Sequence, residues 1–129
     1  MRLVQQPPNS TTCGHAVVAM LANKTYASVC NALGHTKPTT WREMYTMLFT
    51  FGVVCDAGMV PVFGVADIPP VGVLLFPSGV LGHLAVCYGG YVYDPAYDEV
   101  YDTEALPFRK YPANSVLFCS RVYNVPVTR

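Results

Sequence analysis

Residues 83–95 read His-Leu-Ala-Val-Cys-Tyr-Gly-Gly-Tyr-Val-Tyr-Asp-Pro, and this stretch says most about the fold. Apolar and aromatic residues flank Gly89-Gly90, a dipeptide typical of the two-residue turn of a β-hairpin. A turn of that length predicts that Tyr88 pairs with Tyr91, Cys87 with Val92, Val86 with Tyr93 and Ala85 with Asp94.

The same hairpin brings a histidine and a carboxylate to one face of the sheet. Paired residues share a face, and His83 shares its face with Ala85 because side chains alternate along a strand. Asp94, which is opposite Ala85, is therefore the diagonal neighbour of His83, about 7–8 Å away or somewhat less between Cβ atoms. A hydrogen bond between the two side chains can close that gap, provided that the turn has two residues.

After Gly52 the chain consists of short runs rich in Val, Tyr, Phe and Cys, punctuated by Gly and Pro. Such runs are typical of short β-strands. The predicted strands are Val53–Asp56, Gly72–Phe76, Leu81–Tyr88, Tyr91–Tyr93, Glu99–Tyr101 and Val116–Val122. The strand that ends at Tyr88 is apolar on both faces, which predicts a central place in the sheet.

Before Gly52 the sequence is helical in character. Residues 13–22 are apolar nearly all round, as expected of a buried helix, with Thr11 or Thr12 as its N-cap. Two further helices are predicted, one over Tyr26–Leu33 that stops at Gly34 and one that opens with the capping box Thr40-Trp41-Arg42-Glu43 and runs to about Phe51. Helices first and strands second predict an α+β fold with an antiparallel sheet. We expect one domain over residues 1–129, helical over about 11–52 and sheet over about 53–125.

Composition argues against several classes of function. Of the 129 residues, 52% are apolar and 12% charged, and the formal net charge is zero. We therefore expect a sizeable core, no basic surface for nucleic acid and, since the apolar runs are short, no membrane insertion. The start of the chain lacks a long apolar run, so no signal peptide is expected. Five cysteines, an odd number without a C-x-x-C pair, favour a reducing compartment such as the cytoplasm.

Cys13 stands in the first turn of the predicted buried helix. A helix N-terminus carries partial positive charge and free N–H groups, which favour a thiolate and stabilise the oxyanion that forms when a thiolate attacks a carbonyl. By position alone, however, Cys13 is better explained as a small apolar residue that opens a core helix. Burial in the core also explains most of the other cysteines.

A thiolate nucleophile needs a base, and the chain has three histidines. His15 follows Cys13 by two residues, about 200° around the helix axis, so it points away and is interpreted as a structural histidine with satisfied hydrogen bonds. His35 follows a helix end, where C-capping or exposure explains it. His83 is left as the candidate base. Asp94 is the candidate carboxylate that orients its ring, although Asp-Pro by itself is a common turn opener.

Three segments together resemble the papain-like cysteine peptidase superfamily. They are Gln6-Pro7-Pro8-Asn9-Ser10-Thr11-Thr12-Cys13-Gly14, Gly82-His83-Leu84-Ala85-Val86 and Val92-Tyr93-Asp94-Pro95. The order Gln, Cys, His, Asp matches the superfamily, as does the placement of helices before the sheet. Within it, the chain is most similar to the bacteriocin-processing, double-glycine-leader peptidases and their small stand-alone bacterial and phage relatives.

The resemblance implies a catalytic role for four residues. Cys13 would be the nucleophile, His83 the general base and later acid, and Asp94 the orienting carboxylate. The side-chain amide of Gln6, or of its neighbour Gln5, would stabilise the oxyanion together with the backbone N–H of Cys13. Gln6 precedes Cys13 by seven residues, one more than the papain spacing. We expect no attached transporter segment, so cleavage after a double glycine does not carry over.

The resemblance thus predicts a thiol hydrolase that cleaves a peptide or isopeptide bond through an acyl-enzyme on Cys13. Its substrate would be a protein or peptide, and no cofactor or metal is expected. The alternatives are an inactive papain-like binding or inhibitory module and a non-peptidase acyl-transfer enzyme, either a deamidase or transglutaminase-like. A zinc site from Cys13, His15, His83 and Cys87 is disfavoured, because the first two diverge around a helix and no familiar zinc spacing occurs. The chain also has no serine-hydrolase elbow and no phosphate-binding loop.

Overall fold

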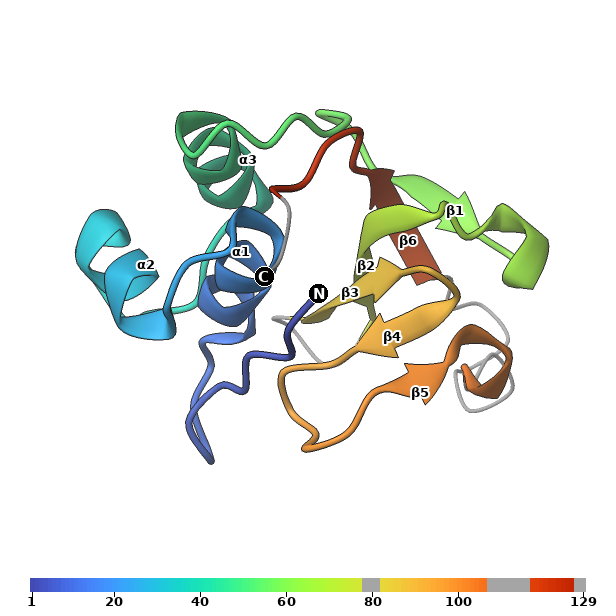
Figure 1. The fold of residues 1–129 in the computed structure, drawn as a ribbon, viewed down its shortest axis with the longest axis horizontal. Coiled ribbons are helices and arrows are strands. Elements are labelled where there is room, and N and C mark those ends of the chain that lie inside the picture. Colours follow the sequence, from blue (N-terminus) through green and yellow to red (C-terminus); the bar gives the residue numbers. More distant parts are fainter. Residues whose placement is uncertain (78–81, 107–116, 127–129) are drawn as a thin grey trace.

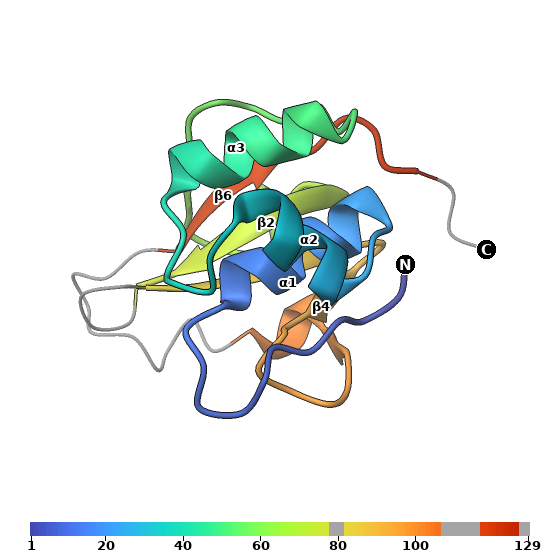
Figure 2. The same cartoon turned by 90° about the vertical axis from the view of Figure 1, so that its left-hand side faces the viewer.

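The computed structural model describes residues 1–77, 82–106 and 117–126. Within these ranges, three α-helices precede six strands, and the strands form one antiparallel sheet. Figures 1 and 2 show the helices together on one side of the sheet. The predicted α+β class and the order of helices before strands are confirmed. No helix in the described ranges is long and apolar enough to cross a membrane.

The helices match the prediction closely. They are α1 (Cys13–Ala22), α2 (Tyr26–Leu33) and α3 (Trp41–Thr50). Every residue of α1 after Cys13 is buried, because α1 packs against β3 on one side and against α2 and α3 on the others. Gly34 ends α2 in the left-handed conformation, with φ 78°, and the Thr40 hydroxyl accepts the N–H of Glu43 at the start of α3.

The predicted cap of α1 and one half of the capping box of α3 need correction. Thr12 occupies the N-cap position of α1, but its side chain caps no N–H group of the helix. Its hydroxyl instead accepts a hydrogen bond from the Tyr26 hydroxyl at 2.8 Å. The Glu43 carboxylate, which the capping box would direct to the start of α3, accepts a hydrogen bond from His35 at 2.7 Å. In both cases the side chain is hydrogen-bonded to a residue of another segment instead of to the start of its own helix.

The strands run in the order β1-β6-β2-β3-β4-β5 across the sheet. Their bounds are β1 (Val60–Val62), β2 (Val71–Phe76), β3 (His83–Tyr88), β4 (Tyr91–Tyr93), β5 (Tyr101–Asp102) and β6 (Leu117–Arg121). The last five were predicted, with small shifts at their ends; residues 81 and 116, at the ends of two predicted strands, lie outside the described residues. β3 lies between β2 and β4, so its predicted central place is confirmed.

Two predictions about strands were wrong. Residues 53–56 form no named strand, and only Cys55 pairs there, in an isolated bridge with Val122. Conversely, β1, which contains Pro61, was not predicted. A proline lacks the N–H that a central strand needs, but β1 is an edge strand and can leave that position unpaired.

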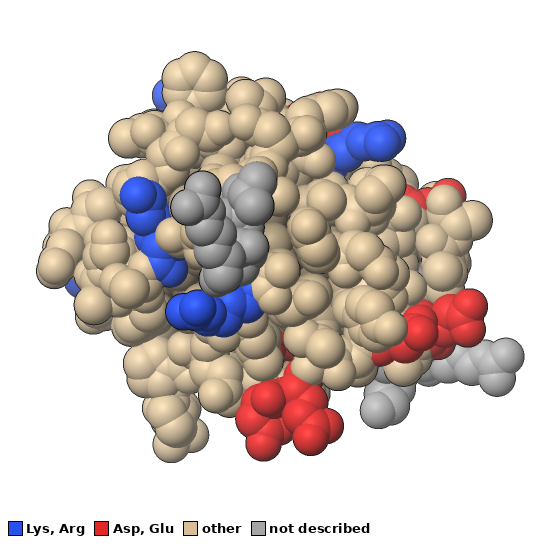
Figure 3. Space-filling model, viewed as in Figure 1, with Lys and Arg blue, Asp and Glu red and all other residues tan. Residues whose placement is uncertain are grey.

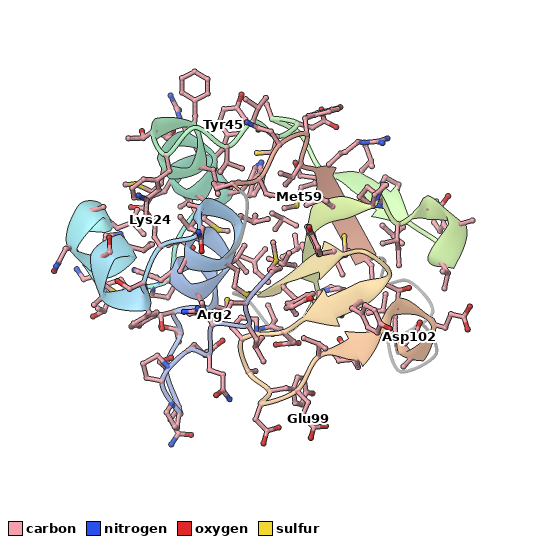
Figure 4. All side chains as sticks on the ribbon, in the orientation of Figure 1. Arg2, Lys24, Tyr45, Met59, Glu99 and Asp102 are labelled. Carbon is pink, nitrogen blue, oxygen red and sulfur yellow. The ribbon has the colours of Figure 1, made fainter. Side chains whose placement is uncertain are left out.

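The sheet separates two hydrophobic cores. Val73 and Val86 face the helices and pack in the larger core with α1. Leu74, Ala85 and Cys87, which alternate with them along β2 and β3, pack in a second core on the far face. Figure 4 shows side chains filling the space between α1 and the sheet. This packing holds the start of α1 beside the start of β3.

Charged side chains are sparse on the face drawn in Figure 3. The two largest acidic areas on that face lie toward β4 and β5, where Figure 4 labels Glu99 and Asp102, and Arg2 and Lys24 lie over the helical half. Among the described residues drawn on that face, Lys and Arg form no continuous stripe.

Candidate active site

The hairpin between β3 and β4 has the predicted register. Gly89 and Gly90, with φ 60° and 87°, form its two-residue turn. Val86 pairs with Tyr93, Cys87 with Val92 and Tyr88 with Tyr91. Positive φ at both turn residues is the geometry that lets a two-residue turn follow the twist of its strands, and glycine adopts it without strain. The fourth predicted pair, Ala85 with Asp94, is not formed, because β4 ends at Tyr93 and Asp94 follows it directly.

His83 and Asp94 are hydrogen-bonded across this hairpin. His83 Nε2 lies 2.6 Å from Asp94 Oδ1. The Asp94 side chain is 4% exposed, against 25% for His83. The same Oδ1 accepts the backbone N–H of Ala96 at 2.9 Å, within the turn that Asp94-Pro95 opens. The carboxylate is therefore held by its own turn while it orients the imidazole, so the turn and the functional interpretations of Asp94 are compatible.

Cys13 reaches His83 because α1 packs on β3. The Cys13 side chain is hydrogen-bonded to His83, and backbone N–H groups of Leu84 and Gly14 lie against its sulfur. Since Nε2 of His83 is engaged with Asp94, the contact with the thiol falls to Nδ1. The three side chains thus form a chain in the order thiol, imidazole, carboxylate.

The surroundings of this chain favour a charged thiol and a charged imidazole. Burial raises the pKa of Cys13, but the hydrogen bonds from His83, Leu84 and Gly14 lower it more, so the pKa lies below the ordinary value for cysteine. Burial lowers the pKa of His83, but the bonds to Asp94 and Cys13 raise it more, to about 9. Both shifts act in favour of a thiolate beside an imidazolium.

The other core cysteines behave in the opposite way. All five cysteines are free thiols. Burial raises the pKa of Cys87 to about 12, and burial likewise raises the pKa of Cys55 and of Cys119. These three fit the interpretation as inert core residues, whereas Cys13 is set apart by its charged neighbour.

Cys13 and His83 open onto a cleft of about 260 Å³. Its walls come from the N-terminal arm, the start of α1, the loop before α3 and the start of β3. The residues that line it are Gln6, Ser10, Thr11, Cys13, Pro38, Thr39, Gly82, His83 and Leu84. Gln6 is on this wall, whereas its neighbour Gln5 is exposed and does not line the cleft. The structure therefore brings together Gln6, Cys13 and His83, with Asp94 behind the histidine.

Gln6 is held in place at both its backbone and its side chain. Its N–H donates to the carbonyl of Pro95 at 2.9 Å, so the N-terminal arm runs beside the loop after β4 (Figure 1). Its Nε2 donates to the carbonyl of Ser10 at 2.9 Å and lies 3.4 Å from the Ser10 hydroxyl. Its Oε1 is buried without a hydrogen-bond partner among the described residues.

Sequence reasoning missed the wall opposite the histidine. Pro38 and Thr39 line the cleft, and Thr39 lies against Gly14, the residue after the nucleophile. A Cβ on Gly14 would stand 1.9 Å from the hydroxyl oxygen of Thr39, so only glycine allows this approach. A glycine inside a helix that is otherwise rich in apolar residues was the available signal for a close contact.

His15 and His35 lie together, away from the cleft. His15 is fully buried and its Nε2 donates to the carbonyl of His35 at 2.7 Å, as expected of a structural histidine. Its Nδ1 is buried without a partner among the described residues, so the prediction that its hydrogen bonds are satisfied holds for one nitrogen only. His35 neither caps the helix nor is simply exposed: its Nε2 donates to Glu43, and its Nδ1 accepts the N–H of Lys37 at 3.0 Å.

The four residues considered for a zinc site do not converge. Cys87 belongs to the core on the far face of the sheet, where its thiol donates to the carbonyl of Pro69 at 3.5 Å. His15 contacts His35 and Tyr26. Within the part of the chain that the structure describes, no group of three or more His, Cys, Asp or Glu side chains is arranged to hold a metal ion.

Comparisons with protein-family models, with curated proteins and with solved structures find no match to this chain. What the site does must therefore be argued from its own geometry.

Proposed function

We propose that the protein is a papain-like thiol hydrolase that cleaves a peptide or isopeptide bond through an acyl-enzyme on Cys13. The observation that carries the proposal is the chain of contacts from the Cys13 thiol through His83 to the buried Asp94 carboxylate, at the edge of a cleft. The cysteine at the helix start supplies a nucleophile, the histidine a base and the carboxylate a group that orients the histidine. The order of helices before an antiparallel sheet supports the papain-like part of the proposal.

The first half-reaction uses the charged pair. The Cys13 thiolate attacks the carbonyl carbon of the scissile amide, and the carbonyl oxygen becomes an oxyanion. The backbone N–H of Cys13 and the side-chain amide of Gln6, on the same cleft wall, would stabilise that oxyanion. The His83 imidazolium then gives its proton to the amide nitrogen, the C–N bond breaks, and the amine leaves a thioester on Cys13.

The second half-reaction restores the enzyme. Neutral His83 takes a proton from a water molecule, which attacks the thioester carbonyl and forms a second oxyanion in the same place. The C–S bond breaks and releases a carboxylic acid and the Cys13 thiolate, with His83 again protonated. Asp94 keeps the ring in one orientation throughout, because its Oδ1 also accepts the N–H of Ala96 and does not rotate freely.

Thiol reactivity tests the proposal most directly. Iodoacetamide at about pH 6 should alkylate Cys13 far faster than the other cysteines, because the lowered pKa of Cys13 raises its fraction of thiolate, the reactive form. Cys30 is the matched control, since it is half-buried like Cys13 and lies on α2, away from His83. His83→Ala should slow the labelling of Cys13 and leave that of Cys30 unchanged. Equal rates at Cys13 and Cys30 in the wild type would overturn the proposal.

A second assay separates the reaction classes. The protein is incubated with a peptide pool, and mass spectrometry compares new peptide termini with a one-dalton change from Gln to Glu. New termini support the peptidase, and a change from Gln to Glu indicates a deamidase on the same triad. A reactive Cys13 without turnover of any peptide indicates the binding or inhibitory module. Free thiols favour the cytoplasm as its place of action, with a protein or peptide as substrate.

A further inference from the structure

A chain of hydrogen bonds links α2 to the wall of the cleft. The Tyr26 hydroxyl donates to Thr12 Oγ1 at 2.8 Å, and Thr12 Oγ1 lies 3.0 Å from Ser10 Oγ. The Ser10 carbonyl accepts Nε2 of Gln6 at 2.9 Å, and the Ser10 hydroxyl lies 3.4 Å from the same nitrogen. We call these four residues the Tyr26 relay. Tyr26 does not line the cleft, whereas Ser10 and Gln6 do.

The direction of each hydrogen bond in the relay follows from the donors and acceptors that its groups have not yet used. Thr12 is 2% exposed, so its hydroxyl proton must find an acceptor inside the protein. Thr12 Oγ1 already accepts from Tyr26, and Ser10 Oγ is the acceptor within reach. The amide of Gln6 is oriented by the same logic, because only an N–H can lie 2.9 Å from the Ser10 carbonyl oxygen. The hydrogen bonds therefore run from Tyr26 through Thr12 to Ser10 and from Gln6 to Ser10, so both ends of the relay meet at Ser10.

The relay also explains the missing cap of α1. A threonine at this position ordinarily accepts an N–H of the first helical turn. The Thr12 hydroxyl is taken by Tyr26 and Ser10 instead and caps no N–H of α1. The N–H groups at the start of α1 therefore have no cap from the Thr12 side chain, and that of Gly14 lies against the Cys13 sulfur. One hydroxyl on α2 thus bears on both groups that would stabilise the oxyanion, the Gln6 amide and the start of α1.

We propose that Tyr26 is a positioning residue of the active site, which acts through Thr12 and Ser10 to hold the oxyanion-stabilising groups in place. This inference rests on the proposed function and extends it to a residue that touches neither the thiol nor the cleft. Tyr26 should matter for reactions that form an oxyanion and not for the reactivity of the thiol itself, because Cys13, His83 and Asp94 lie outside the relay.

Two chemical probes separate these effects. p-Nitrophenyl acetate acylates a thiolate at a carbonyl: the C–S bond forms, an oxyanion develops, and nitrophenolate leaves. Iodoacetamide alkylates the same thiolate at a saturated carbon: the C–S bond forms, iodide leaves, and no oxyanion develops. The ratio of the two rates at Cys13 therefore reports the stabilisation of the oxyanion. Cys13→Ala measures the background release of nitrophenolate, which is subtracted.

The relay is cut at two links, so that the test does not depend on one variant. Tyr26→Phe removes only the hydroxyl, and Thr12→Val replaces the second hydroxyl with a methyl group. Each should lower the ratio of acylation to alkylation by about tenfold, less than the loss of an oxyanion-stabilising group itself. Thr12→Ser keeps a hydroxyl and should retain the wild-type ratio. Tyr45→Phe, on α3 beside Trp41 and outside the relay, is the matched control and should also retain it.

The outcomes distinguish this inference from the proposed function. An unchanged ratio in Tyr26→Phe and Thr12→Val, with Cys13 still alkylated rapidly, would overturn the role of Tyr26 and leave the thiol hydrolase standing. A proportional fall of both rates would also overturn it, because the relay would then support the thiol or the fold instead of the oxyanion. Wild-type Cys13 that reacts no faster than Cys30 would overturn both proposals.

Discussion

Thr39 lies directly against Gly14, the residue that follows the candidate nucleophile. A Cβ added to Gly14 would be 1.9 Å from Thr39 Oγ1 and 3.0 Å from the sulfur of Met44. The loop before α3 can therefore form one wall of the cleft only because position 14 has no side chain. This contact couples the first turn of α1 to a segment that comes after α2.

We expect Gly14→Ala to destabilise the protein by about 1–3 kcal/mol, the usual cost of overpacking a tight site. Chemical denaturation monitored by circular dichroism measures the loss. Thr39→Ala removes the nearest clashing atom. Gly14→Ala should therefore cost less stability in the Thr39→Ala background than in the wild type. Strictly additive losses would show that the two residues do not press on each other.

Asp94→Asn should slow the alkylation of Cys13 while the fold stays intact. The Asp94 carboxylate raises the pKa of His83, and protonated His83 lowers the pKa of Cys13. A neutral amide weakens both effects, so the thiol pKa rises. Each unit of that rise removes about tenfold of the thiolate at about pH 6. Iodoacetamide rates measured against pH give the new thiol pKa directly. A wild-type profile in this variant would remove Asp94 from the site.

Protonation of His83 should stabilise the fold in acid and lose that effect in base. Its pKa is about 9 in the folded protein against an ordinary 6.5, so its contribution is complete below about pH 6.5 and is lost as the pH rises toward about 9. The lowered pKa of Cys13 acts in the opposite direction, because it adds stability as the pH rises. The measurement therefore uses a Cys13→Ala background. Cys13 no longer raises the pKa of His83 there, so the contribution of His83 is lost somewhat below pH 9.

The experiment compares Cys13→Ala with Cys13→Ala/Asp94→Asn. The difference between their free energies of unfolding should be largest near about pH 6 and shrink toward about pH 9, as the histidine that Asp94 binds loses its charge. A difference that stays constant over this range would show that His83 and Asp94 are not coupled by charge.

His15→Ala should destabilise the protein without changing the reactivity of Cys13. The His15 side chain is fully buried, donates to the His35 carbonyl and packs its ring at right angles to that of His35. Its removal leaves a cavity and an unpaired carbonyl, which together cost about 2–4 kcal/mol. Thermal unfolding measures the loss. Alkylation of Cys13 below the melting temperature should stay near the wild-type rate, and a large fall would place His15 in the active site.

The turn that sets the hairpin register offers a stabilising change. Gly89 has φ 60°, a conformation that asparagine tolerates, and Asn-Gly is the favoured pair for this turn. Gly89→Asn should therefore raise the free energy of unfolding by about 0.5 kcal/mol, because the unfolded chain has less freedom to lose. Gly90→Val is the contrasting variant, since a β-branched residue is strained at φ 87°, and it should be destabilising. Equal stability of the two variants would contradict this account of the turn.

Local patterns predicted much of the fold. The bounds of α1 and α2 agree with the sequence prediction, and those of α2 are marked by Thr25 and Gly34, which act within a few residues of the helix ends. The hairpin register was predictable for the same reason: a two-residue turn determines which residues face each other. The contact between His83 and Asp94 follows from that register.

Predictions failed where a distant partner competes for a local group. Threonine is a common helix cap, yet the Thr12 side chain caps no N–H of α1. Its oxygen accepts a hydrogen bond from the Tyr26 hydroxyl of α2 instead. Pro61 argues against a strand, yet it stands in β1, an edge strand that tolerates a missing N–H. Neither the position of Tyr26 beside Thr12 nor the edge position of β1 is encoded in a short window of residues.

Local sequence patterns were enough to predict all three helices and five of the six strands in the described ranges, as well as the pairing of His83 with Asp94, since these depend on neighbours along the chain or across one turn. The contact of Cys13 with His83, the place of Gln6 instead of Gln5 on the cleft and the wall that Thr39 forms became visible only in the tertiary structure. These relationships depend on how α1 packs against β3 and how the N-terminal arm is bonded to the loop after β4. The packing of α1 is driven by the burial of its apolar surface. That driving force comes from the whole surface of the helix and not from any one residue.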